Sequence, residues 1–300
     1  MSVVAEIQKR IVGTTTGLFA HAPYPLEDSM LYRGDPGLFG PESITWPVIG
    51  DVAAFVGGIR ALLVQAAHQE VAAGVADHSR YRDDPLGRLS RTSAYVTATA
   101  FGAGPEVAHA VDLVRRAHRP VSGESHRGRS YSADRPSQAA WVHNVLTDSF
   151  LVAYRVFGRQ EISDEDADRF VHEQTSVGKL LDADPLPETA EELSEWVTGH
   201  PAIGRSPGME GAVGFLKSPP LPLRVKIGYR ILYSAAAATI PAELRRVLGL
   251  KRIPGAILAG TATIRFLRWA LGSSPSWYIA LRRVGAPLPA GHRFRTEPFR

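Results

Sequence analysis

The sequence contains no cysteine among its 300 residues. Disulfides, thiolate zinc sites, iron–sulfur clusters, a cysteine nucleophile and a haem thiolate ligand are therefore excluded. Any metal must be held by histidine, carboxylate or tyrosine, or be brought in by an external cofactor.

Signals for export and for spanning a membrane are also lacking. The first 30 residues show no basic segment followed by an apolar one, as a signal peptide would. The longest apolar runs lie near residues 231–240 and 253–267. The first is too short to cross a bilayer, and the second is interrupted by Arg265. We expect a cytoplasmic protein that can make peripheral contact with a membrane surface.

Common catalytic and binding motifs are missing as well. No GxxxxGK[ST], GxGxxG, GxSxG, HExxH or EF-hand pattern occurs, and Glu106-x-x-His109 is a single copy rather than the pair a di-iron bundle needs. The net charge of +4 is mild, and no zinc finger, arginine-rich tail or RNP-like aromatic pattern accompanies it. Nucleic acid is therefore not an expected partner.

The composition is that of a globular protein, with 44% hydrophobic and 21% charged residues. A chain of this length can bury a sizeable core in one large domain or two small ones. Helical periodicity dominates, and no series of alternating strand runs with hairpin turns is visible. We predict an all-α fold. The sequence does not indicate an oligomeric state.

The first 50 residues differ from the rest because they are rich in proline, glycine and aromatic side chains. We predict an irregular N-terminal arm over 1–50, packed on a helical domain over 51–300. The arm should lie on a core because its apolar residues are costly to leave in water. These residues are Leu38, Phe39, Ile44, Trp46 and Val48.

The stretch from Gly104 to Gly123 contains the most informative helix. Gly104-Pro105 suits a helix start, and Pro120 and Gly123 end it. One stripe of this helix is apolar and finishes in a histidine; it consists of Val107, Val111, Val114 and His118. Arg115 flanks the stripe. Such a histidine and arginine could hold a metal or haem iron and pair with an anion such as a propionate, or His118 could be a core residue bonded to a carbonyl.

Three further helices carry polar candidates. We predict one over 51–76, capped by Asp51 and carrying His68 and Glu70, and one over 85–100, capped by Asp84. The second has a polar face that either lines a site or meets solvent, with Leu89, Val96 and Ala100 opposite. That polar face consists of Arg88, Arg91, Thr92, Tyr95 and Thr99. A third helix, over 141–158, should bury His143 in a structural or a functional role.

Other segments are assigned from their turn and cap signals. Ser163 should cap an amphipathic helix, and the acidic run over 188–195 should begin another. We interpret 204–223 as a Pro/Gly-rich connection and the polar stretch after Gly123 as a loop. The C-terminal third should be helical, with an irregular end over 283–300.

Several segments, taken in order, resemble the catalytic domain shared by the latex clearing protein (a rubber oxygenase) and the MpaB-type oxygenases. The resemblance covers roughly residues 30 to 250. The segments that carry it are DPGLFGPESITWPVIGD (35–51), RLSRTSAYVTATAFG (88–102), VRRAHRPVSG (114–123), WVHNVLTDSFLVAY (141–154) and DRFVHEQ (168–174).

This resemblance implies a globin-reminiscent helical fold that holds haem b. It implies His118 as the proximal iron ligand, because Arg115-x-x-His118 matches the family pattern, with Arg115 as a propionate or ligand-orienting partner. Arg88 and Thr92 would line the distal side. Arg91 stands where the family has a lysine that can bind the iron, and a protonated guanidinium has no lone pair with which to do so.

The function that follows is a haem-dependent oxygenase, acting with dioxygen on a small hydrophobic lipid or isoprenoid. Glu70 is the nearest carboxylate that could act as a distal base, and His143 would be a distal histidine or one supporting the site. We do not expect efficient cleavage of rubber, because the lysine is absent and the chain shows no export signal. The alternative is a non-catalytic helical protein that binds haem or another ligand.

Overall fold

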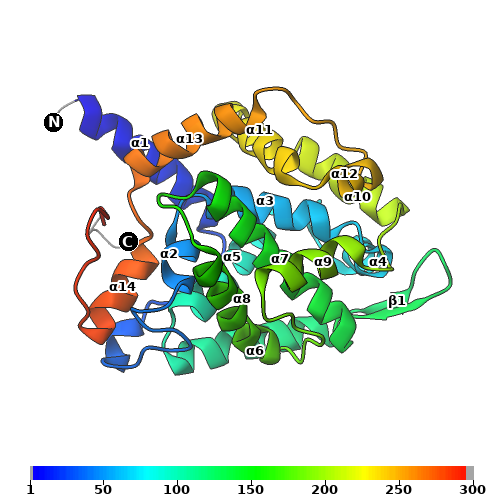
Figure 1. Cartoon of the computed structure of the whole chain (residues 1–300), viewed down its shortest axis with the longest axis horizontal. Helices are drawn as coiled ribbons and strands as arrows, with labels where there is room; N and C mark the ends of the chain where they lie inside the picture. Colours follow the sequence, from blue (N-terminus) through cyan, green and yellow to red (C-terminus); the bar gives the residue numbers. More distant parts are fainter. Residues whose placement is uncertain (1–2, 295–300) are drawn as a thin grey trace. The chain divides into compact units, whose positions relative to one another are not determined.

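The computed structural model describes residues 3–294, apart from the side chain of Arg224 (Figure 1). Within them 14 α-helices accompany a single two-stranded sheet, and 65% of the structure is helical. The predicted all-α class is confirmed. The helices are α1 (Val3–Phe19), α2 (Thr45–Gly50), α3 (Ala54–Gln65), α4 (Gln69–His78), α5 (Pro85–Phe101), α6 (Gly104–His118), α7 (Pro136–Phe157), α8 (Asp164–Lys179), α9 (Ala190–Gly199), α10 (Pro207–Lys217), α11 (Leu223–Thr239), α12 (Ala242–Val247), α13 (Ala256–Leu271) and α14 (Pro275–Val284).

Contacts divide the chain into two compact units. Unit 1 comprises Met1–Val52, Arg80–Val114 and Ile264–Arg300, and unit 2 comprises Ala53–Ser79 and Arg115–Thr263. The division predicted from the sequence, an arm over 1–50 and a helical domain over 51–300, stays a prediction.

The second half of the N-terminal segment contributes to the core of unit 1. Phe39, Trp46 and Val48 are buried as expected, and Trp46 Nε1 donates to the carbonyl of Ala100 at 2.8 Å. The backbone of 20–44 has only one short 3₁₀ helix, η1 (Ser29–Tyr32), as regular structure. Helix α1, which periodicity did not reveal, precedes this irregular stretch.

A buried arginine joins distant parts of unit 1. The guanidinium of Arg283 donates to the carbonyls of Asp35 and Phe101 at 2.6 and 2.8 Å. It also donates to Ser29 Oγ at 2.6 Å, and Ser29 in turn donates to Glu106. These bonds hold η1 and α14 together, since a buried guanidinium is stable only where its donors are satisfied.

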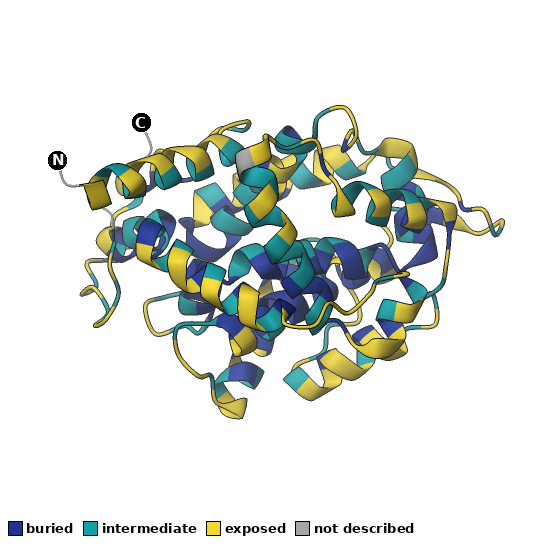
Figure 2. Cartoon of the chain, turned by 90° about the horizontal axis from the view of Figure 1, so that it is seen from above, coloured by how far each residue is buried: buried dark blue, intermediate teal, exposed yellow. Residues whose placement is uncertain are grey.

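Unit 2 is built around the pairing of α3 with α7. Gly57 permits their close approach, because a Cβ there would lie 2.7 Å from Phe150 Cδ1. Arg60 of α3 donates to Asp148 and Ser149 of α7 at 2.6 and 2.8 Å, in a fully buried group. In Figure 2 the buried residues concentrate on one side of many helices, as expected of amphipathic helices.

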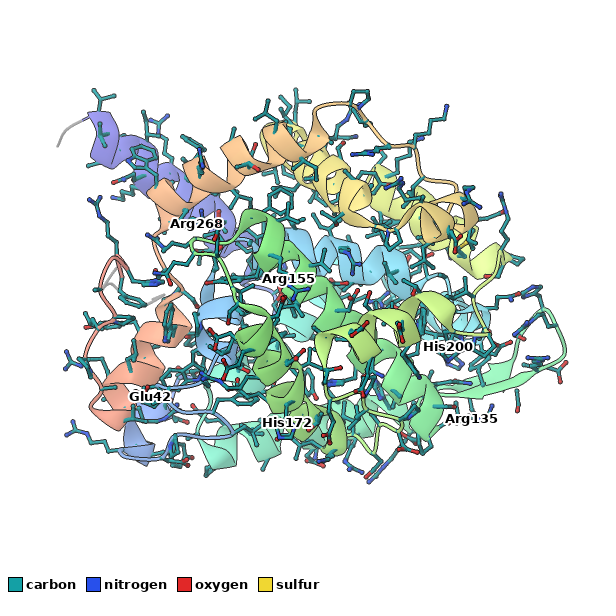
Figure 3. The ribbon with its side chains drawn as sticks, in the orientation of Figure 1. Glu42, Arg135, Arg155, His172, His200 and Arg268 are labelled. Carbon is teal, nitrogen blue, oxygen red and sulfur yellow. The ribbon has the colours of Figure 1, made fainter. Side chains whose placement is uncertain are left out.

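The prediction of one helix over 51–76 is wrong: the helix does not begin directly after Asp51, and the segment forms two helices instead of one. Asp51 follows α2 and does not cap a helix; instead it receives two hydrogen bonds from Arg268, at 2.6 and 3.1 Å (labelled in Figure 3). The chain then forms two helices, α3 and α4. The break falls before α4 because His68 is its N-cap, with the ring nitrogen accepting from Val71 N at 3.3 Å. Histidine is not among the preferred N-cap residues, so no signal in the sequence indicates that a new helix begins after His68.

Two segments interpreted as irregular also contain regular structure. The 204–223 connection includes α10, whose N-cap Ser206 accepts from Met209 N and is followed by Pro207. The polar loop after Gly123 forms an antiparallel hairpin of β1 (Ser122–Glu124) and β2 (Ser130–Ser132), with Gly123 opposite Tyr131. Of the C-terminal end predicted to be irregular, 285–294 lacks helix, and 295–300 falls outside the described residues.

Candidate functional site

His118 is the last residue of α6, as the sequence predicts. Along its stripe Val107 and Val111 are buried, while Val114 and His118 are half-buried. Burial lowers the pKa of His118, opposed by the charge of Asp134, so the imidazole is neutral at physiological pH. Within residues 3–294 the ring has no hydrogen-bond partner. A neutral, unpartnered imidazole keeps a nitrogen lone pair available for a ligand.

Arg115, one turn earlier, is exposed, and its guanidinium already binds other residues of the protein. Its Nε and Nη2 donate to the carbonyl of Leu180 at 3.2 and 2.8 Å, and Nη1 lies 2.9 Å from Asp182. Asp182 adopts a left-handed φ of 54° in the turn after α8. Arg115 therefore fastens this turn to the end of α6.

His143 is held by polar partners on α7 and α8. Burial lowers its pKa to about 4, against a hydrogen bond with the backbone of Gln174 that raises it. Thr147 Oγ1 lies 3.5 Å from the ring Nε2. A Cβ at Gly178 would lie 2.9 Å from His143 Cδ2, so α8 packs directly against the ring. This environment is typical of a structural histidine between two helices.

Glu70, the predicted base, lies buried in the first turn of α4. Arg127 donates to it bidentately, with Nη2 2.6 and 2.8 Å from the two carboxylate oxygens, and Ser125 Oγ lies 3.3 Å away. Burial acts to raise the pKa of Glu70, but the hydrogen bonds and charge of Arg127 outweigh it and the pKa is lowered. The carboxylate is ionised and firmly paired.

Sequence reasoning missed a ring cluster beside Glu70. His68 lies with its ring centroid 5.4 Å from Trp141 and 5.1 Å from His200, and His200 lies 4.8 Å from Trp196. Figure 3 labels His200, just after α9. Burial, helped by the charge of the neighbouring His200, lowers the pKa of His68 to about 4. These rings come from segments far apart in the chain, so no spacing pattern could identify them.

In unit 1, α5 carries Arg88. The helix starts as predicted, since Asp84 accepts from Gly87 N at 3.0 Å and Pro85 follows the cap. Arg88 is half-buried, with its guanidinium carbon 5.7 Å from the centre of the Tyr81 ring. Burial lowers the pKa of Arg88, and within residues 3–294 its guanidinium has neither a hydrogen bond nor an ion pair. A desolvated, unpaired cation favours binding an anion.

The other residues of the predicted polar face are partly exposed and partly buried. Arg91 and Thr92 are exposed, and Arg91 pairs with Asp84 at 3.1 Å. Thr99 is buried and donates to the carbonyl of Tyr95, one turn earlier. Leu89, predicted on the apolar face, is 37% exposed, so that part of the assignment was wrong. The helix instead buries Ser90, which joins it to the carbonyl of Leu18 and the amide of His21.

Other features of the described chain constrain the site further. Residues 3–294 contain no group of three or more histidine and acidic side chains placed to hold a metal ion. None of the helices in that range has the length and apolarity needed to cross a membrane. Unit 2 has an open cavity of about 680 Å³, lined by Ala238, Arg252, Ile257 and others, which includes none of the predicted site residues.

Comparison with known families decides the classification. Residues 46–269 match the catalytic domain of the ER-bound oxygenase mpaB/B'/rubber oxygenase family. The chain belongs to this family. Searches of curated proteins and of solved structures found no match. The matched segment of this mpaB/rubber oxygenase family member contains every predicted site residue from Glu70 to His143, and family membership supports an oxygenase-like function.

Proposed function

We propose that this chain is a haem b-dependent oxygenase with His118 as its iron ligand. The observation that carries the proposal is the neutral ring of His118, without a hydrogen-bond partner within residues 3–294, at the end of a helix in the family's catalytic domain. The substrates would be dioxygen and a small hydrophobic lipid or isoprenoid.

The donor chemistry fits haem. The porphyrin supplies most of the iron ligands, so one protein histidine is sufficient, and no thiolate is needed. When bound, haem supplies the redox chemistry that activates dioxygen. His118 contributes a lone pair and, through burial, stays deprotonated so that the nitrogen is not lost to a proton.

Arg88, in unit 1, is a cation suited to an anionic ligand group. Its guanidinium is desolvated and, among residues 3–294, unpaired, whereas Arg115 already binds Leu180 and Asp182. For Arg115 to act as a propionate partner it would have to release Asp182. Thr92 is exposed on the same helix as Arg88 and offers a hydroxyl donor.

One observation favours the second candidate, a haem-binding protein without oxygenase turnover. Glu70 is held ionised by the bidentate bonds of Arg127, which lowers its affinity for a proton. A general base typically contributes about 10²–10⁴ to a rate. If Glu70 is the base, Arg127 must release it during turnover.

Two measurements test the proposal. A visible absorption spectrum of protein produced with a haem supply should show a Soret band and about one haem per chain; a colourless protein under those conditions rejects it. The loaded protein, given reductant and dioxygen, should then be assayed on a panel of unsaturated and isoprenoid lipids. Spectral haem without any product establishes the haem-binding alternative.

Latex belongs in the same assay as a comparison substrate. We expect lipid products and little cleavage of cis-polyisoprene, because Arg91 replaces the family lysine and Glu70 is tightly paired. Rapid release of aldehydes and ketones from latex alone would contradict this expectation. The proposal includes peripheral contact with a membrane, where a lipid substrate would be encountered.

A further inference from the structure

The first two turns of α1 leave apolar side chains in solvent. Val3 is 77% exposed, Val4 51% and Ile7 42%, and α1 buries none of its residues. Val3, Ile7 and Arg10 follow at helical spacing, so they lie along one side of the helix. An apolar helix end continued by a cation is the pattern of an interfacial helix.

Two aromatic residues of α13 are exposed in the same unit. Phe266 is 49% and Trp269 42% exposed, and their ring centroids lie 5.6 Å apart. Gln8 Nε2 donates to the carbonyl of Trp269 at 3.2 Å, which joins α1 to this turn of α13. Figure 1 shows α1 and α13 crossing close to one another, in agreement with this bond.

The charges on these two helix segments are mainly positive. Lys9 and Arg265 are exposed, and within residues 3–294 neither forms an ion pair. Arg10 pairs with Glu6, at 3.1 Å, which neutralises that acidic side chain. The whole chain carries a net charge of +4, so its long-range attraction to an anionic surface has the same sign.

We propose that this surface, the α1–α13 face formed by Val3, Val4, Ile7, Arg265, Phe266 and Trp269, docks onto a membrane containing anionic lipids. The aliphatic and aromatic side chains enter the headgroup region, where tryptophan is favoured, and Arg265 meets lipid phosphates, while Lys9, on another side of α1, adds to the long-range attraction. An unpaired cation next to apolar groups matches an anionic lipid surface better than a second copy of the chain, which would bring the same charges together.

This inference deepens the peripheral contact proposed above and is independent of haem. It is tested by flotation of the full chain with vesicles of phosphatidylcholine alone or with about one third phosphatidylglycerol. The wild type should float with the anionic vesicles, and added salt should weaken this binding. The triple variant Val3→Ser, Ile7→Ser, Phe266→Ser should bind about tenfold or more weakly.

The controls separate the face from general effects. Leu113→Ser removes a side chain on α6 that is 50% exposed, and it should bind like the wild type. Lys9→Gln with Arg265→Gln should reduce both the binding and its salt dependence. Because all these positions are exposed, circular dichroism should show each variant folded, and the Soret band should be unaffected.

Three results would overturn the inference. The first is unchanged flotation of the triple variant, and the second is equal, salt-independent binding to neutral vesicles. The third is a wild-type dimer, detected by light scattering, that the triple variant abolishes while no form of the protein floats; the face would then be an interface between two copies. These measurements do not depend on haem, so they remain valid even if the protein does not bind haem.

Discussion

His118 and His143 show how two histidines that look alike in sequence differ in availability. Burial lowers the pKa of both, so neither is protonated at neutral pH. His143 has Thr147 and the backbone of Gln174 as partners and is packed against Gly178. His118 has no hydrogen-bond partner within residues 3–294. His118 therefore differs from His143 in having a ring nitrogen that is available to a ligand, and not in the direction of its pKa shift.

A pair of substitutions tests this distinction. His118→Ala should lose the Soret band of haem-supplied protein or alter it grossly, because the iron loses its protein nitrogen. His143→Ala, the matched control on α7, should keep most of the band, although removing a packed ring will lower stability. The opposite pattern in absorption spectra would move the ligand to His143.

Arg91 allows a second test at the level of one side chain. It is exposed, pairs with Asp84 and carries a guanidinium that has no lone pair to donate. The resting ferric protein should therefore have no ligand from this position, and Arg91→Ala should leave its spin-state spectrum unchanged. A nitrogen-ligand signal in electron paramagnetic resonance that disappears in Arg91→Ala would show that residue 91 does bind.

At the scale of elements, α5 depends on a single cap. Asp84 accepts from Gly87 N and also pairs with Arg91, and these bonds lower its pKa. Asp84→Ala should reduce the free energy of unfolding by about 1 kcal/mol, the usual loss for a cap. Asp84→Asn should retain most of it, and Asp83→Ala should have little effect. Urea denaturation measures all three, and equal losses from Asp83→Ala and Asp84→Ala would contradict a capping role.

The elements that could be predicted were those with strong local signals. Asp84-Pro85 and Ser163 begin helices where the sequence places them, and Pro120 ends α6. The 51–76 helix failed because its break is made by a histidine cap, and its supposed cap, Asp51, pairs with Arg268, 217 residues away. A contact at that separation leaves no mark on local periodicity.

In the candidate site too, features of a single helix were predictable and contacts between distant segments were not. The stripe ending in His118 is a property of one helix, so the sequence contains it. The environment of Glu70 depends on other segments, since Arg127 reaches it from the β1–β2 hairpin and His200, whose ring lies near that of His68, follows α9. The residues that decide whether Glu70 can act as a base are therefore brought to it by tertiary structure, and only the structure identifies them.

At the scale of the whole molecule, two histidines with a lowered pKa make stability depend on pH. His68 and His143 have pKa values lowered to about 4, compared with about 6.5 in an unfolded chain. Between these values the unfolded chain binds more protons than the folded one, so stability is complete above about pH 6.5 and falls as the pH drops towards 4. At pH 5 each histidine should reduce the free energy of unfolding by about 2 kcal/mol relative to neutral pH.

Replacing one of these groups tests the origin of this dependence. His143→Gln removes one titrating ring while leaving the helix cap formed by His68 intact, so the loss of stability between pH 7 and 5 should become smaller by about 2 kcal/mol. The exposed His109 provides the control, because His109→Gln should leave the loss unchanged. Urea unfolding curves at the two pH values measure each difference. An identical loss in wild type and His143→Gln would mean that His143 does not cause the acid sensitivity, and that other histidines with a lowered pKa, such as His68, dominate it instead.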